Sequence, residues 1–132
     1  MQEMKAIDLL RQTIQLGEHL LATADEDDYA SWNDVVLRTL RVLFGPSSEQ
    51  FLSFRFPGGG QAGGTSTAET PEERKMERIR NTITRKLSVL KEVETDLEAG
   101  SVDAALGWTH SADTLHESLT QLGNQFASPD RA

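Results

Sequence analysis

The residues best suited to chemistry are two histidines and an aspartate near the end of the chain. His110, Asp113 and His116 form an HxxDxxH pattern, and such side chains commonly bind metal ions. Two ligands on one helix share a face when they are three or four residues apart. Six residues apart, the two histidines project about 120° from each other. We therefore expect solvated histidines and predict no metal site and no cofactor, since a metal-dependent enzyme would need a further ligand from another helix.

Four consecutive acidic residues, Asp25 to Asp28, are a second candidate, as a loop for a divalent cation. They lack the alternation, the central glycine and the final glutamate of an EF-hand loop. We interpret them as a capping turn, because negative charge is favoured at a helix N-terminus. Nucleophilic catalysis has no support either, since the chain has no cysteine and no GxSxG motif. The sequence predicts a protein that is not an enzyme.

A basic stretch between residues 74 and 86 is the strongest candidate for binding. It contains six basic residues and one acid, Glu77. On a helix, Arg74, Arg78 and Arg85 lie opposite the apolar stripe and form an outward row, the arginine ridge. Two interpretations stay open: a dock for an anionic partner (a nucleotide, a nucleic acid or an acidic protein) and a solvated helix face. No aromatic residue interleaves with the basic ones, which makes single-stranded nucleic acid an improbable partner.

Five helices are expected to position these residues. Hydrophobic periodicity and capping signals place them at residues 3–24, 29–44, a short stretch from 47, 71–98 and 101–126. Ser47 with Gln50 would cap the third helix, and Thr70 followed by Pro71 would start the fourth. Small residues along the first helix, such as Gly17, predict close packing by two neighbours.

The fold predicted is an all-α bundle, forming one helical domain over residues 1–132. A glycine-rich linker, expected to be flexible, occupies residues 56–70, because five glycines in seven residues cannot hold one backbone conformation cheaply. It separates an N-terminal three-helix block, 1–55, from a long antiparallel helical hairpin, 71–127. The last helix carries a heptad-like seam that includes Leu115, Leu119 and Leu122. An exposed part of this seam would pair with a second copy.

Charge and composition limit the possible partners. The 132 residues contain 21 acidic and 13 basic side chains, and the net charge is −8. This charge opposes non-specific binding to nucleic acid or to an anionic membrane. The chain has no cysteine, no apolar signal region and no apolar run that matches a bilayer. We therefore predict a cytoplasmic protein that binds no membrane.

The order of motifs resembles a known family. Residues 6–20 read AIDLLRQTIQLGEHL, Trp32 follows, and then come VLRTLRVLFGPSSEQFLSF over 36–54 and TRKLSVLKEVETDLE over 84–98. This is similar to the small helical region that precedes TIR-like nucleotide-binding or other effector domains in bacterial proteins, often in defence systems. The resemblance covers residues 1–98 and implies an accessory or regulatory module, with no catalytic residue carried over. The chain departs from that pattern because a further helix, 101–126, stands where the effector domain would start.

Two functions follow as hypotheses. The favoured one is a non-enzymatic interaction or oligomerisation module, accessory or regulatory in a bacterial defence or signalling system. It would bind a protein partner or a second copy through the arginine ridge or the leucine seam. The alternative is a small acidic inhibitor, such as an antitoxin, an immunity protein or a nucleic-acid mimic, which the charge of −8 suggests. Charge reversal at Asp25 to Asp28 should then abolish inhibition.

Overall fold

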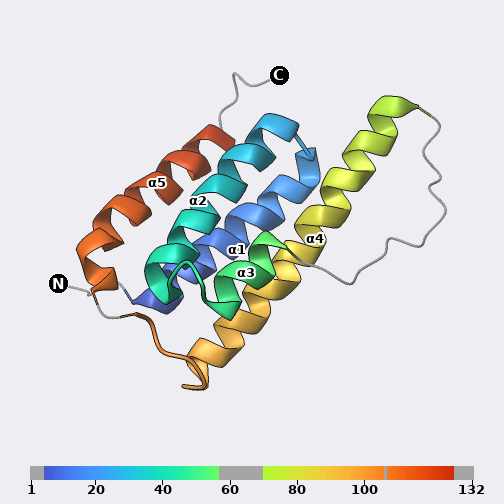
Figure 1. Cartoon of the computed structure of the whole chain (residues 1–132). Helices are drawn as coiled ribbons and strands as arrows, with labels where there is room; N and C mark the ends of the chain where they lie inside the picture. The colour runs from blue at the N-terminus through green and yellow to red at the C-terminus, as the bar shows by residue number, and fades with distance from the viewer. Residues whose placement is uncertain (1–4, 57–69, 106, 127–132) are drawn as a thin grey trace.

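Five α-helices and one short 3-10 helix make up the described part of the chain in this computed structural model, residues 5–56, 70–105 and 107–126 (Figure 1). The elements are α1 (Ala6–Thr23), α2 (Glu26–Phe44), α3 (Glu49–Arg55), α4 (Pro71–Glu98), η1 (Trp108–Ser111) and α5 (Ala112–Phe126). None of the described residues forms a strand, and the predicted all-α bundle is confirmed. Most of the predicted linker, residues 57–69, lies outside the described residues, as do residues 1–4, 106 and 127–132.

Side-chain caps begin α2 and α4 as the sequence predicts. The carboxylate of Asp25 accepts a hydrogen bond from the Asp28 backbone N–H at 3.0 Å. Because Asp25 itself is the cap, α2 begins at Glu26, three residues earlier than expected. The hydroxyl of Thr70 accepts from the Glu73 N–H at 3.1 Å, so α4 begins at the predicted residue. These caps satisfy N–H groups that have no partner within the helix.

The turn between α2 and α3 differs by one residue from the prediction. Gly45 ends α2 with a φ of 102°, which a residue with a side chain rarely adopts. Ser48, rather than Ser47, then caps α3, because its hydroxyl accepts from the Phe51 N–H at 3.1 Å. The chain thus turns sharply, and α3 packs against both α2 and α4.

The last predicted helix, 101–126, is shorter in the structure. Gly100 and Gly107 both have positive φ, 78° and 84°, so the backbone between them does not continue a helix. Ala105 donates its N–H to the carbonyl of Leu43 at 2.5 Å, which ties this connection to the end of α2. The 3-10 helix η1 and then α5 follow. The connection therefore carries the chain from the end of α4 to the end of α2.

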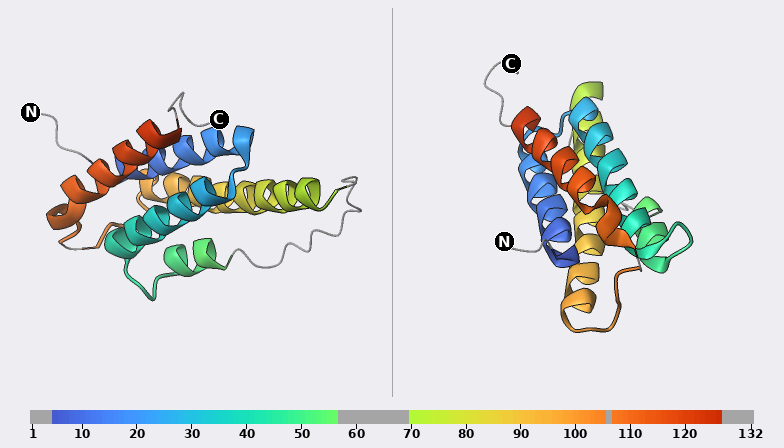
Figure 2. Two further views of the ribbon diagram at one scale, coloured as in Figure 1. Left: turned by 90° about the horizontal axis from the view of Figure 1, so that it is seen from above. Right: turned by 90° about the vertical axis from the view of Figure 1, so that its left-hand side faces the viewer.

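This route decides which helices pack together. The helices α1 and α2 form a central pair, with α5 on one side and α4 and α3 on the other (Figures 1 and 2). The helices α4 and α5 run in opposite directions, as predicted (Figure 1), but these two fully described helices share no packing contact. The predicted helical hairpin is therefore wrong as a packed pair, because α1 and α2 lie between its two members.

The core is centred on Trp32, whose side chain is fully buried. Its indole N–H donates to the Thr13 carbonyl of α1 at 2.9 Å, and its ring meets Phe54 of α3 edge-on at 5.6 Å. Gly17 faces the same ring and Leu87 of α4, so α1 approaches both neighbours closely, as its row of small residues predicts. One tryptophan thus joins α1, α2 and α3.

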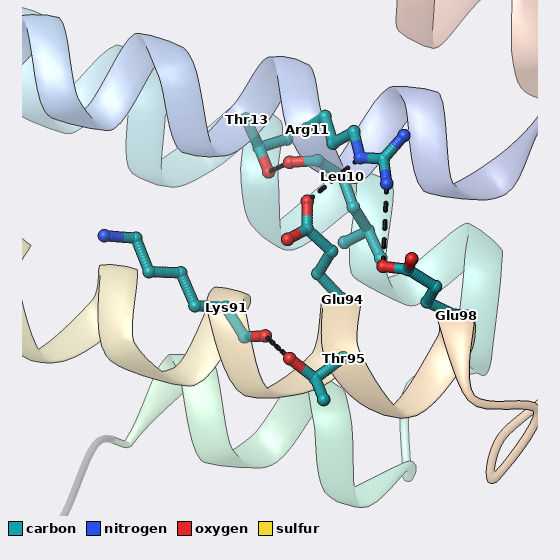
Figure 3. A network of polar contacts seen from close by, with 7 residues as sticks. All are labelled: Leu10, Arg11, Thr13, Lys91, Glu94, Thr95 and Glu98. Carbon is teal, nitrogen blue, oxygen red and sulfur yellow. Dashed lines mark hydrogen bonds and ion pairs between the residues drawn. The ribbon is translucent and has the colours of Figure 1, made fainter.

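Ion pairs on the surface join α4 to α1. Figure 3 shows Arg11 of α1 between Glu94 and Glu98 of α4, at 3.3 and 3.6 Å. Lys91 of α4 reaches Glu18 of α1 at 3.6 Å. Exposed pairs of this kind add little stability. They do direct Glu94 and Glu98 toward α1, which distinguishes them from the other acids of the same helix.

Candidate functional site

The basic stretch of α4 divides into two sets with different surroundings. In the first set, Lys75 pairs with Glu26 of α2, and Arg80 donates from Nε to the Leu21 carbonyl at 3.2 Å. That carbonyl belongs to the last turn of α1, where carbonyls lack helical partners and a positive charge is favoured. These two cations are therefore engaged with α2 and α1.

The second set is the arginine ridge, Arg74, Arg78 and Arg85. Arg74 and Arg78 are exposed and Arg85 is half-buried, and none of them has an ion-pair partner among the described residues. Residues 71–82, which we call the α4 arm, include no buried residue. In both views of Figure 2 the arm reaches the end of the bundle, and in the left view it extends beyond α1 and α2. The structure therefore places Arg74 and Arg78 on an outward face, as predicted, whereas Arg85 is half-buried where the arm joins the rest of the bundle.

A groove of about 570 Å³ begins where the ridge ends, between α3, α4 and the residues that follow α4. Its apolar lining includes Val89 and Val93 of α4 and Phe56, the residue that follows α3. Its charged lining consists of Glu49, Arg85, Glu92 and Asp96. Phe56 is 64% exposed, so a large apolar ring stands open to solvent at the groove. The three carboxylates form no ion pair within the described part of the chain.

The leucine seam was predicted to pair in part with a second copy, but in the structure α1 and α2 cover it. Leu115, Leu119 and Leu122 are only 1%, 1% and 5% exposed. They are buried because α5 packs on α1 and α2, whose apolar faces provide the cover that a second copy was expected to provide. These leucines belong to the core, so they are not available to bind a partner in this structure.

The histidine pattern spreads over η1 and α5. His110 and Asp113 are exposed, whereas His116 is half-buried. The Nδ1 atom of His116 lies 3.1 Å from the side-chain oxygen of Gln12 in α1. Among the residues that the structure describes, no three His, Asp or Glu side chains are grouped closely enough to hold a metal ion.

The acidic run at 25–28 is used by the fold. Asp25 caps α2, and Glu26 pairs with Lys75. Asp28 is buried and accepts a hydrogen bond from the side-chain amide of Gln125 in α5 at 2.9 Å. The interpretation as a capping turn is confirmed. Charge reversal here would disturb the packing of α2 with α4 and α5, so it does not isolate an inhibitory surface.

Lys86 belongs to the basic stretch of α4, but unlike the other basic residues of that stretch it is buried. It is only 5% exposed, and its ammonium group donates to the side-chain oxygen of Asn33. The same group lies 4.7 Å from the Phe54 ring centre and 5.6 Å from that of Tyr29. Burial lowers the pKa of Lys86 to about 8. The sequence does contain a signal for this burial: Lys86 lies three residues after Ile83, so both residues lie on the apolar side of the helix.

Raising the pH from about 7 to about 9.5 should stabilise the fold through Lys86. Its pKa is about 8 in the folded chain and 10.5 ordinarily. Between these values the unfolded chain binds more protons, so the free energy of unfolding rises with pH. At 1.36 kcal/mol per pKa unit, the gain is up to about 2 kcal/mol over this range.

Urea unfolding of the wild type and of Lys86→Met at several pH values would check this gain. Methionine fills an apolar site and does not titrate, so the variant should lose the rise in stability. Lys75→Met is the matched control, since the Lys75 side chain is half exposed and should leave the rise intact. Identical pH profiles for the wild type and Lys86→Met would contradict the assignment.

No family model matches this chain, and neither the curated proteins nor the solved structures contain a significant match. By their fold, the described residues are an all-α bundle of five α-helices with a charged groove beside α4. In the described part of the chain, no helix combines the length and the apolar character needed to cross a bilayer.

Proposed function

We propose that this protein is a non-enzymatic interaction module whose binding surface combines the arginine ridge with the groove beside α3. One observation carries the proposal. The basic residues of α4 that face the bundle all have partners, whereas the outward-facing Arg74 and Arg78 and the half-buried Arg85 at the groove have no ion-pair partner among the described residues. Arginine is enriched at protein interfaces, where its planar group binds carboxylates in fixed geometry.

The groove adds the second half of the surface. It places exposed aromatic and aliphatic area beside carboxylates without ion pairs, and Arg85 lies at its border with the ridge. Exposed apolar area bordered by a few charged groups suits a segment of a protein partner, since interfaces combine an apolar centre with a polar rim. The proposed setting, a cytoplasmic accessory or regulatory role in a bacterial defence or signalling system, rests on the sequence resemblance over residues 1–98.

An acidic inhibitor is the second candidate. The observation in its favour is the group of groove carboxylates, Glu49, Glu92 and Asp96, which have no ion pair within the described residues. Under this alternative, charge reversal at these three positions would abolish inhibition, since the run at 25–28 is occupied by capping and packing.

Reversing the charge of the ridge should weaken the binding of partners to this protein. We expect Arg74→Glu with Arg78→Glu to lower the yield of cross-linked adducts in the native host cells by at least about tenfold, which corresponds to about 1.4 kcal/mol. The control is Arg38→Glu with Arg41→Glu on α2, because both residues are exposed and the change in net charge is the same. Equal yields from folded ridge and control variants would refute the proposal.

A further inference from the structure

The outer face of α4 is divided into a positive and a negative half. Arg74, Arg78, Arg85, Glu92 and Asp96 all lie within about 20° of one line along the helix, at 100° per residue. The three arginines occupy the N-terminal part of this line, and the two acids occupy the C-terminal part inside the groove. We call these five residues the α4 charge line.

The charge line is complementary to itself when a copy is reversed. Arg74 and Asp96 lie eleven residues before and after Arg85, and Arg78 and Glu92 lie seven residues before and after it. Two antiparallel α4 helices related by a two-fold axis at Arg85 would therefore place Arg74 opposite Asp96 and Arg78 opposite Glu92. Each contact would occur twice, as in any two-fold interface between identical chains.

We propose that the partner of the ridge and groove is a second copy of this chain, with the α4 arm of each copy in the groove of the other. The inference rests on the proposed function and names its partner. Arg74 and Arg78 of one copy meet Asp96 and Glu92 of the other, and Glu49 of α3 adds a third carboxylate to the groove that receives them. The site is complete only when the second copy contributes its arginines.

The remaining acids of α4 support this choice of residues. Four acids alternate along the end of the helix, and two of them, Glu94 and Glu98, are engaged by Arg11 of α1 (Figure 3). The other two, Glu92 and Asp96, have no ion pair in the described chain. Arg11 thus pairs with the two acids that face α1, and the two acids that match the arginine spacing have no ion pair in the described chain.

The shape of the arm supports the same arrangement. Residues 71–82 include no buried residue, so their outward face is open to a neighbour. At about 1.5 Å per residue, Arg74 lies about 16 Å along the helix from Arg85, which is the distance from Arg85 to Asp96. An arm of one copy therefore has the length to reach the acidic end of the other groove.

Arg85 has a distinct role because it lies on the two-fold axis. Two guanidinium groups would approach each other there, and like charges brought together at an interface weaken association. We expect Arg85→Gln to tighten the dimer by about tenfold, whereas Arg41→Gln on α2, with the same change in net charge, should have no effect.

Compensating charge variants test the arrangement directly. An acidic variant, Arg74→Glu with Arg78→Glu, and a basic variant, Glu92→Arg with Asp96→Arg, would each place like charges at all four contacts. Each should be monomeric in analytical ultracentrifugation at low salt, with association at least about a hundredfold weaker than for the wild type. An equimolar mixture restores all four opposite-charge contacts, so it should form a heterodimer. Circular dichroism would confirm that both variants stay helical.

The outcomes separate this inference from the proposed function. A dimer that survives in either charge variant, or a mixture that stays monomeric, would overturn the α4 arrangement. A wild type that is monomeric at its highest soluble concentration would also overturn it, while loss of cross-linked adducts in the ridge variant would still uphold the proposed function. A monomeric wild type whose adducts do not depend on the ridge would overturn both.

Discussion

Trp32→Ala should lower the free energy of unfolding by about 3–5 kcal/mol, because it removes the side chain that joins three helices. The indole is fully buried, donates to the Thr13 carbonyl of α1 and contacts the Phe54 ring of α3 edge-on. Alanine leaves a cavity that these rigid neighbours cannot fill by small movements. Small domains are stable by only about 5–15 kcal/mol, so this variant should lose much of its stability.

Urea unfolding followed by far-UV circular dichroism would measure the loss. The matched control is Trp108→Ala, which removes the other tryptophan from η1, where the side chain is only half-buried. We expect this control to cost about 1–2 kcal/mol, in proportion to the smaller apolar area that it exposes. A comparable loss in both variants would show that Trp32 is not the centre of the core.

The helices were predictable where the signals are local. Thr70 and Pro71 start α4 at the residue that the sequence indicates, because a hydroxyl cap and a fixed proline φ act on neighbouring backbone alone. The start of α2 is predicted three residues late because three aspartates of the run, Asp25, Asp27 and Asp28, could each cap a helix, and the sequence does not show which one does.

The neighbours of the last helix could not be predicted from its pattern. A seam such as Leu115 and Leu119 looks the same whether α4, a second copy or the central pair covers it. The choice depends on the connection after α4, where two glycines with positive φ and the bond from Ala105 to the Leu43 carbonyl redirect the chain. That bond joins residues far apart in sequence, so no local pattern signals it.

Only the part of the candidate site that lies on one helix was predictable. Arg74, Arg78 and Arg85 share a helix face by periodicity alone, and the structure places Arg74 and Arg78 outward, with Arg85 half-buried. The groove was not predictable, because Glu49 and Phe56 are distant in sequence from the α4 residues that line it. Tertiary packing, rather than helix geometry, brings these carboxylate and aromatic groups to the end of the ridge.

Gly17→Ala should also destabilise the fold, by about 1–3 kcal/mol, although alanine is the better helix former by about 1 kcal/mol. A Cβ atom at this position would lie 2.6 Å from the Trp32 ring and 2.7 Å from a methyl group of Leu87. Both neighbours are buried, so α1 must move away from α2 and α4 to admit one methyl group.

Gly123→Ala in α5 is the matched control, and it should change stability in the opposite direction. Its Cβ would lie 3.5 Å from a Leu16 methyl group, an ordinary van der Waals contact, so the gain in helix propensity of about 1 kcal/mol should remain. Urea midpoints for the two variants should therefore fall on opposite sides of the wild-type midpoint. A stabilising Gly17→Ala would mean that α1 lies farther from Trp32 and Leu87, and the close packing of α1 between α2 and α4 would then be wrong.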